Sequence, residues 1–436
     1  MADSIQQKET QNAIRNFPNT LHPALPELVN ALIMIKKAAA LANKKAGNLE
    51  GKIADAIVEV SDQLLNRRDD SKFQTHAIQG GAGTSINMNV DEVIATLASE
   101  KVGLNVLPLD HVNLSQSTND VNPSALKLAL LIIHQSLLTE IDQLVSVLNE
   151  KATKFQDVIK LGRTHLQDAV PFNQGQEFKA FADTISRDTQ KLKASAEYLL
   201  ELNLGGTAVG NSVNASKEYI KQVYIELNEL TGLDFKPALN MIALTSSGSD
   251  FTSYQYSLLV LFSDLSKMAT DLRVLSSGPA GGIGEIILPR VQAGSSIMPA
   301  KVNPVMPEYI NQVFYYIAGK SQTALQAAEA ASLQLGIMFP VLADSLLNSA
   351  KLAHDSIRAF RENCVSGIEL NIERIERNLH GSFAYAALLT PVLGYEKVAE
   401  YVSKAIKQSK ELRTIVLENE ELTAEEFDKL LSIDNS

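Results

Sequence analysis

Three stretches of the chain repeat apolar residues at three- and four-residue spacing, with no internal glycine or proline. They run over 125–156, 175–204 and 250–277. This spacing is typical of amphipathic helices. At about 1.5 Å of rise per residue, each stretch predicts a helix on the order of 40–50 Å long. Because such lengths exceed those of ordinary globular helices, the pattern favours a long helical bundle, within one chain or between copies of it.

The rest of the chain carries weaker signals. Residues 304–362 contain Pro307 and Pro340 and predict two further helices. Strand patterns are confined to 283–288 and to a few residues near Ile159. The sequence therefore predicts a mainly all-α fold. We expect three domains: a mixed, mostly helical N-terminal domain over 1–119, a central long-helix bundle over 120–372, and a small, charged C-terminal helical domain over 373–436.

Composition narrows the class of partner. The 436 residues include 39 Lys and Arg against 50 Asp and Glu, for a net charge of −11, and 45% are hydrophobic. Because nucleic-acid binding depends on concentrated positive charge, this balance argues against a nucleic-acid partner. A small anionic substrate is compatible with it, provided that the site is positive locally.

Several kinds of site are excluded by residue type. Cys364 is the only cysteine, which rules out an internal disulfide and a cysteine-based metal site. The seven histidines show no metal-ligand spacing, so we expect neither a metal nor a cofactor. Residues 1–17 lack the apolar core of a signal peptide, and the apolar patch 128–133 ends at His134, far short of a membrane span. We therefore expect a cytoplasmic protein without a membrane partner.

Polar islands interrupt the helical pattern. Each is rich in hydroxyls and amides and lies beside a predicted helix start. Hydroxyls, backbone N–H groups and helix N-termini together make good carboxylate sites. Helix capping explains Thr118 or Asp120 alone more simply, but runs of this length exceed what a cap requires. The islands cover residues 79–89, 110–120, 162–168 and 294–304.

Common phosphate and hydrolase motifs do not fit these islands. Gly81-Ala-Gly83 would need a third glycine where the chain has Ile86. Gly319-Lys-Ser321 lacks the first glycine of a P-loop, since Phe314 stands there. No Gly-x-Ser-x-Gly elbow occurs in the sequence. The chemistry must therefore be of another kind.

Taken in order, the islands resemble the site regions of the aspartase/fumarase superfamily. Residues 294–304 read Gly-Ser-Ser-Ile-Met-Pro-Ala-Lys-Val-Asn-Pro, similar to the signature loop of that superfamily. Gly-Ala-Gly-Thr-Ser at 81–85, Ser-Thr-Asn-Asp at 117–120 and Gly-Arg-Thr-His at 162–165 match the other regions. The resemblance covers nearly the whole chain. It implies a three-domain fold whose long helices form the twenty-helix core of a homotetramer, with each site shared by three subunits.

Within the superfamily, the closer resemblance is to the aspartate ammonia-lyases. Ala82, Thr118, Ala300 and Pro304-Val-Met-Pro-Glu308 stand where those enzymes differ from fumarases. The resemblance implies reversible removal of ammonia from L-aspartate to give fumarate, through an aci-carboxylate intermediate. Two alternatives stay open. One is a fumarate hydratase, which uses water in place of ammonia, and the other is a catalytically silent homologue that binds dicarboxylates.

The resemblance also implies a role for each island residue. Ser295 matches the general base, on a loop with Gly294 as its hinge. His165, paired with Glu308, lies near the substrate amino group together with Asn119. The carboxylate whose charge grows would be bound by hydroxyl residues, namely Thr84, Ser117, Thr118 and Ser296. The other carboxylate would be held by Thr164, Lys301 and Asn303.

Several positions depart from the superfamily pattern. Leu109 stands in place of an asparagine near a secondary anion site, Ala243 in place of a glutamate and Ala280 in place of an arginine. None of these departures removes a proposed catalytic group. Together they motivate the silent-homologue alternative and leave open a related amino acid as the substrate.

Overall fold

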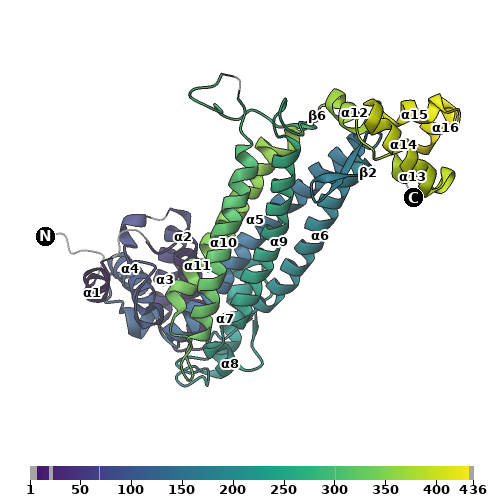
Figure 1. Cartoon of the computed structure of the whole chain (residues 1–436). Coiled ribbons are helices and arrows are strands. Elements are labelled where there is room, and N and C mark those ends of the chain that lie inside the picture. The colour runs from purple at the N-terminus through teal and green to yellow at the C-terminus, as the bar shows by residue number, and fades with distance from the viewer. Residues whose placement is uncertain (1–6, 19–22, 68, 300, 432–436) are drawn as a thin grey trace. The chain divides into compact units, whose positions relative to one another are not determined.

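The computed structural model describes residues 7–18, 23–67, 69–299 and 301–431; Ala300, which helps to carry the resemblance, lies outside them. Five long helices dominate this part of the chain (Figure 1). The helices predicted from apolar spacing and the two predicted for 304–362 are thereby confirmed, and so is the mainly all-α class. The long helices are α5 (Thr118–Lys154), α6 (Gln174–Glu197), α9 (Ser249–Leu275), α10 (Val305–Glu329) and α11 (Phe339–Asn363).

Shorter helices make up most of the rest. Those that come before the long helices or between them along the chain are α1 (Lys8–Asn16), α2 (Pro26–Lys45), α3 (Gly51–Asn66), α4 (Thr84–Val102), α7 (Lys217–Thr231) and α8 (Met241–Ser246). Those that follow are α12 (Ile372–His380), α13 (Ala386–Leu393), α14 (Tyr395–Gln408), α15 (Leu412–Glu418) and α16 (Ala424–Leu431).

Strands are short and pair into three two-stranded sheets among the described residues. The predicted strand signals near Ile159 and within 283–288 are confirmed. The antiparallel pairs are β1 (Ile159–Thr164) with β2 (Gln167–Asn173) and β5 (Ile286–Ile287) with β6 (Glu369–Leu370), and the parallel pair is β3 (Glu201–Leu202) with β4 (Lys236–Pro237).

The chain forms two compact units, and each long helix contributes residues to both. Unit 1 comprises the described parts of 1–139, 188–262 and 313–355. Unit 2 comprises those of 140–187, 263–312 and 356–436. The expected division into three domains, with boundaries near 119 and 372, stays a prediction.

Buried polar contacts connect the long helices in unit 1. Gln255 of α9 donates hydrogen bonds to Ser321 of α10 and Ser349 of α11, each at 3.0 Å. The hydroxyl of Tyr254 lies 3.3 Å from Nδ1 of His134 in α5. Since an unpaired buried polar group is costly, these contacts favour one arrangement of the helices over its alternatives.

Apolar contacts pack segments of unit 2 together. Phe155 at the end of α5 and Phe178 of α6 pack edge to face, with ring centroids 5.4 Å apart. The helices from α12 onward share a core cluster that also includes Leu161 of β1. Its central side chains include Tyr385, Leu412 and Phe427. This cluster gives the C-terminal segment a local hydrophobic core.

By length and composition α5 could cross a membrane, the one such helix in the described part of the chain. Half of its most apolar window is buried inside the protein, and its first turn holds the fully buried carboxylate of Asp120. The core helix of a globular protein can have the same length and composition.

Candidate active site

The first turn of α5 contains a capping box. The Oγ of Ser117 accepts a hydrogen bond from the backbone N–H of Asn119 at 3.3 Å. The Oδ1 of Asp120 accepts one from the backbone N–H of Ser117 at 2.9 Å. These reciprocal bonds pair N–H groups that a helix start leaves without partners. The capping interpretation of Asp120 is therefore correct, and the hydroxyl proton of Ser117 remains available to a ligand.

Asp120 also reaches a second segment. Its Oδ2 accepts hydrogen bonds from the backbone N–H groups of Gly205 and Thr207, both at 2.9 Å. Burial raises the pKa of Asp120 to about 6. The hydrogen bonds from backbone N–H groups lower this pKa, but burial has the larger effect. Asp120 thus joins the start of α5 to the 205–207 turn, where Gly205 and Thr207 have left-handed φ values of 87° and 58°.

Asn119 is held in one orientation by its neighbours. Its Nδ2 donates to the carbonyl of Ala208 at 2.8 Å, and its backbone carbonyl accepts from Nδ2 of Asn203 at 3.1 Å. Because a carbonyl can only accept, the amide nitrogen of Asn119 must face Ala208. The side chain therefore presents its Oδ1, an acceptor, to any ligand.

Thr84 begins α4 directly after a strained turn. Gly81, Ala82 and Gly83 all have left-handed φ values, of 77°, 54° and 85°. A Cβ on Gly83 would lie 2.4 Å from Nδ2 of Asn122 in α5, so the turn needs a glycine at this close approach. The exposed hydroxyl of Thr84 donates to the carbonyl of Gly81 at 2.7 Å. To donate to a carboxylate, this hydroxyl must rotate away from the turn.

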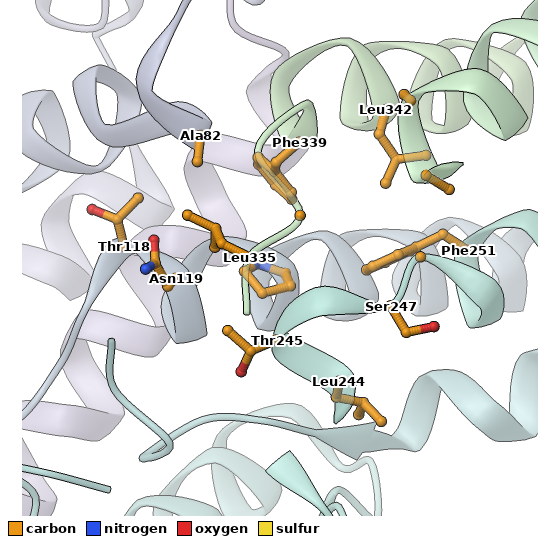
Figure 2. A pocket seen from close by; sticks show the side chains of 15 residues that line it. Ala82, Thr118, Asn119, Leu244, Thr245, Ser247, Phe251, Leu335, Phe339 and Leu342 are labelled. Atoms are coloured by element: carbon orange, nitrogen blue, oxygen red, sulfur yellow. The ribbon is translucent and has the colours of Figure 1, made fainter. Parts of the chain in front are cut away.

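A pocket in unit 1 opens beside Thr118 and Asn119 (Figure 2). Its volume is about 30 Å³, enough for a water molecule or a small substituent. Apolar side chains, among them Ala82, Leu335 and Phe339, form most of its wall. The start of α5 and the turn before α4 therefore border one pocket.

Thr164 and His165 lie at the tip of the β1–β2 hairpin, and both are exposed. Thr164 pairs with Gln167, so His165 and Leu166 form the two-residue turn, with left-handed φ values of 55° and 59°. Such a turn favours Asn-Gly, and each non-glycine residue in it costs about 1 kcal/mol. A strained, exposed histidine in place of the favoured residue is typical of a functional position.

Ser295 has an unusual environment for a loop hydroxyl. Its Oγ accepts hydrogen bonds from the backbone N–H groups of Ile297 at 3.1 Å and Met298 at 3.0 Å. Ser295 is half-buried, whereas Ser296 beside it is exposed. Two N–H donors aimed at one hydroxyl oxygen favour negative charge on that oxygen.

The two ends of the 294–304 loop meet. The Nδ2 of Asn303 donates to the carbonyl of Gly294 at 2.6 Å. A Cβ on Gly294 would lie 1.8 Å from the carbonyl oxygen of Lys301, so a side chain there would prevent the closure. Lys301 and Asn303 line a cavity of about 760 Å³ in unit 2, together with Arg273 of α9.

The predicted site residues fall into two groups. Those of unit 1 share the start of α5 and the turn before α4, namely Thr84, Ser117, Thr118 and Asn119. Those of unit 2 lie on the hairpin tip, the loop and the start of α10, namely Thr164, His165, Ser295, Ser296, Lys301, Asn303 and Glu308. The pairing of His165 with Glu308 and the assembly of one site from both groups stay predictions.

The sequence did not predict the second role of Asp120. The helix predicted over 175–204 is followed by Gly205-Gly206, a typical helix stop, but α6 already ends at Glu197. The glycines instead belong to the turn whose backbone N–H groups reach Asp120. An acidic residue in a helix's first turn, followed along the chain by a Gly-Gly-Thr turn, was the available signal.

The described residues contain no group of three or more His, Cys, Asp and Glu side chains that could hold a metal ion.

Comparisons with known proteins add a second line of observation. A family model described as Lyase matches residues 1–319, and one described as Fumarase C C-terminus matches residues 386–435. The aspartate ammonia-lyase of Bacillus subtilis (strain 168) is 42% identical over 437 residues, covering 99% of this chain and 92% of that protein.

Solved structures agree with these matches. The fumarate lyase:delta crystallin from Brucella melitensis, bound to cobalt, has a TM-score of 0.95 and 40% identity, covering 99% of this chain and 95% of that chain. The class II fumarase from Schistosoma mansoni has a TM-score of 0.93 and 34% identity, with coverage of 99% and 95%.

Long helices that carry hydroxyl and amide groups at their starts, together with these matches, define a carbon–nitrogen lyase. The chain belongs to the aspartase/fumarase superfamily, and within it the sequence is similar to the aspartate ammonia-lyases. The resemblance to this superfamily that the four polar islands indicate is confirmed.

Proposed function

We propose that the chain is an aspartate ammonia-lyase, which converts L-aspartate reversibly to fumarate and ammonia. Similarity to aspartate ammonia-lyases over the full chain supports this substrate. The observation that carries the mechanism is the Oγ of Ser295, which accepts two backbone N–H bonds. Ser295 is the general base of the reaction.

The difficult step is removal of a proton from the carbon next to the side-chain carboxylate of aspartate. A serine hydroxyl is a poor base in water, and its alkoxide needs stabilisation. The N–H groups of Ile297 and Met298 supply it, since both point at the oxygen that carries the charge. The proton moves to Ser295 Oγ, and the electron pair of the C–H bond enters the carboxylate. The result is an aci-carboxylate with two negative charges.

The start of α5 is suited to that growing charge. A helix N-terminus carries partial positive charge and free N–H donors. In its bond to Asn119 the Oγ of Ser117 acts as the acceptor. The hydroxyl proton of Ser117 is therefore available to donate to the carboxylate. Thr118, Thr84 and Ser296 complete the set of hydroxyl donors.

Ammonia leaves next, and it takes the electron pair of its C–N bond while the carbon–carbon double bond of fumarate forms. Before this step the amino group is an ammonium ion, which only donates hydrogen bonds. The outward Oδ1 of Asn119 is a matching acceptor, since Nδ2 is occupied by Ala208. His165, oriented by Glu308, lies on the same side of the substrate.

The second carboxylate of the substrate is held by Lys301, Asn303 and Thr164. A lysine ammonium and amide donors pair with a carboxylate by charge-assisted hydrogen bonds. As membership of the aspartase/fumarase superfamily implies, we propose a homotetramer in which each site takes residues from three subunits. The chain then works in the cytoplasm on small molecules, with no cofactor.

One assay tests the proposal against its alternatives. The protein is mixed with L-aspartate and, separately, with L-malate, and fumarate absorbance is followed. Fumarate from aspartate alone is the expected result. Fumarate from malate alone identifies a fumarate hydratase and refutes the proposal. An assembled protein that forms fumarate from neither substrate is a silent homologue.

A further inference from the structure

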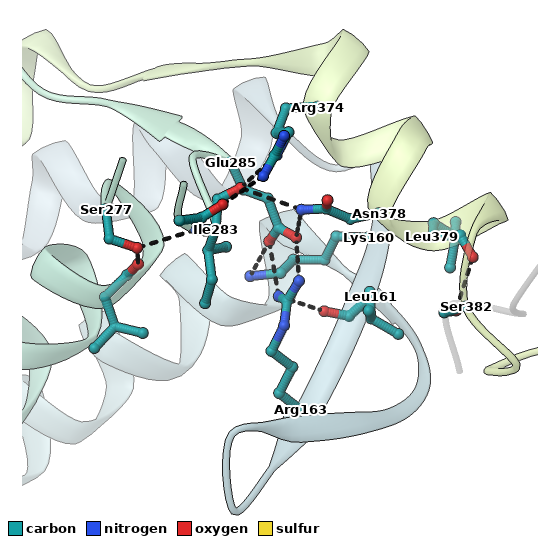
Figure 3. Close-up of polar contacts among 12 residues, drawn as sticks. Lys160, Leu161, Arg163, Ser277, Ile283, Glu285, Arg374, Asn378, Leu379 and Ser382 are labelled. Carbon is teal, nitrogen blue, oxygen red and sulfur yellow. Dashed lines mark hydrogen bonds and ion pairs between the residues drawn. The ribbon is translucent and has the colours of Figure 1, made fainter. Parts of the chain in front are cut away.

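Outside the proposed site, a buried carboxylate contacts the β1–β2 hairpin of unit 2 through two side chains of β1. Glu285 is 0% exposed and lies directly before β5 (Figure 3). Nη2 and Nη1 of Arg163 donate to its two oxygens at 2.6 and 3.1 Å. Nδ2 of Asn378 in α12 donates to Oε1 at 2.9 Å, and Nζ of Lys160 lies 3.5 Å from Oε2.

The backbone of Glu285 is fixed as firmly as its side chain. Its N–H donates to the carbonyl of Leu275 at the end of α9, and its carbonyl accepts from the N–H of Asn371, both at 2.9 Å. Three segments therefore meet at one residue. The side chain holds β1 through Arg163 and α12 through Asn378, and the backbone continues through β5 toward the 294–304 loop.

The charges of the cluster depend on Glu285. Burial alone would raise its pKa, but hydrogen bonds from Arg163 and Asn378 and the charge of Lys160 outweigh burial and lower it. Lys160 has a second partner in Glu177, at 3.0 Å. The guanidinium of Arg163 also donates to the Leu161 carbonyl at 3.2 Å, but Glu285 is the carboxylate it pairs with. Removing the charge of Glu285 leaves Arg163 as a partly buried, uncompensated cation.

Arg163 is adjacent to Thr164 in the sequence, one residue before the strained tip. The register of β1 and β2 shifts between Leu161 and Arg163, which marks a bulge at Gly162. A Cβ on Gly162 would lie 2.7 Å from the carbonyl oxygen of Val170, so the bulge requires glycine. Bulges reorient the side chains that follow them. The direction of the tip is therefore set by the bulge together with the anchor at Arg163.

We propose that Glu285 is a positioning residue for the reaction, and that it acts by fixing Thr164 and His165 at the hairpin tip through Arg163. The proposal rests on the proposed function, in which Thr164 holds a substrate carboxylate and His165 lies near the amino group. Glu285 itself touches no substrate. Its role is to keep a turn of unfavourable sequence in one place.

The test is Glu285→Gln, which keeps the size of the side chain and removes its charge. We expect kcat/KM for aspartate to fall by about 100-fold, the loss that misplacement by about 1 Å causes. We also expect the amides of 163–168 to exchange hydrogen about tenfold faster, with the amides of α5 and α9 unchanged. The matched control is Glu369→Gln in β6, which breaks an exposed pair with Lys154 and should alter neither quantity.

A double variant separates positioning from general damage. If Glu285 acts through the tip, Glu285→Gln lowers kcat/KM less in the Thr164→Ala background than in the wild type, because only its effect on His165 remains. Fully additive losses overturn the proposal, as does wild-type exchange at 163–168 in Glu285→Gln. Should Glu285→Gln not fold, Arg163→Lys replaces it in the same measurements, because lysine keeps the charge but cannot donate to both oxygens in parallel.

Failure of the proposed function is distinguishable from failure of this inference. If the wild-type protein forms no fumarate from aspartate, the reaction is wrong. The hydrogen-exchange comparison of Glu285→Gln with Glu369→Gln still shows whether Glu285 fixes the hairpin tip.

Discussion

The two parts of the candidate site are built differently. At the start of α5, the carboxylate of Asp120 is completely buried and pairs with backbone N–H groups of two segments. In the 294–304 loop, Ser295 bonds to the backbone of its own loop, and the neighbouring side chain of Ile297 is 87% exposed. The first part is fixed by the protein core. The second has internal hydrogen bonds that fix its shape, but most of its side chains are exposed to solvent.

This difference corresponds to two chemical tasks. Donors that bind a growing negative charge work best when they are fixed in advance, because no energy is then spent on orienting them during the reaction. A serine base works only where water is excluded, and an exposed loop gains that environment by closing or by being covered. We infer that the unit 1 part supplies fixed donors for the growing charge, whereas the loop becomes active once Ile297 and Met298 are covered.

The largest expected effect is at the base itself. Ser295→Ala should lower kcat by about 1,000-fold or more, since it removes the group proposed to take the proton. The assembly should stay intact, because the hydroxyl bonds only to exposed loop backbone. Fumarate absorbance and size-exclusion chromatography measure the two quantities. Ser366→Ala, which removes an exposed hydroxyl bonded to the Arg361 carbonyl, is the control, and near-normal turnover by Ser295→Ala would rule out this base.

The second-largest effect is expected at Asp120, in the part of the site that the protein core fixes. Asp120→Asn places an NH2 group against backbone N–H donors and should lower kcat/KM by about 100-fold through displacement of the α5 start. Loss of a buried charge offsets the lost hydrogen bonds, so the free energy of unfolding should change by less than about 2 kcal/mol. Steady-state kinetics and urea unfolding give both values. Asp55→Asn, on an exposed pair with Lys44, is the control. Unchanged kinetics in Asp120→Asn would show that this link does not matter for the reaction.

A smaller effect concerns pH. Burial raises the pKa of Asp120 from 3.8 to about 6, so between these values the folded state binds more protons than the unfolded state. The contribution of Asp120 to stability is therefore greatest below pH 3.8 and declines as pH rises to 6, by at most about 3 kcal/mol. Asp91, whose pKa burial also raises to about 6, adds to the same slope beside Lys36. Urea unfolding from pH 4 to 7 should show a shallower decline in Asp120→Asn, and an identical slope would contradict the assignment.

The helices could be predicted because apolar spacing reports one face of a helix directly. Runs such as 250–277 needed no information from elsewhere in the chain, and α9 follows that run closely. The candidate site residues could be named from sequence motifs, but the contacts that support them could not. Asp120 bonds to residues 205 and 207, and Glu285 to residues 163 and 378, and these partners are distant in sequence.

Contacts made by backbone groups explain the other features that the sequence did not predict. The N–H groups that meet Ser295 and Asp120 belong to residues whose side chains carry no signal of the contact. The left-handed turn at His165 and Leu166 is likewise hidden, because its sequence is not one that such turns favour. Sequence patterns report side chains, whereas these features depend on where the backbone is placed.

The smallest effect is expected at that turn, and it separates function from stability. His165→Asn with Leu166→Gly gives the hairpin its favoured turn, which should stabilise it by about 1–2 kcal/mol. The same change removes the imidazole proposed to lie near the substrate amino group and should lower kcat/KM by about tenfold or more. Leu166→Gly alone keeps the ring, so it should gain part of the stability with little loss of rate. A double variant that is more stable and fully active would mean that the histidine has no role in the reaction; one that is no more stable would mean that the turn stores no strain.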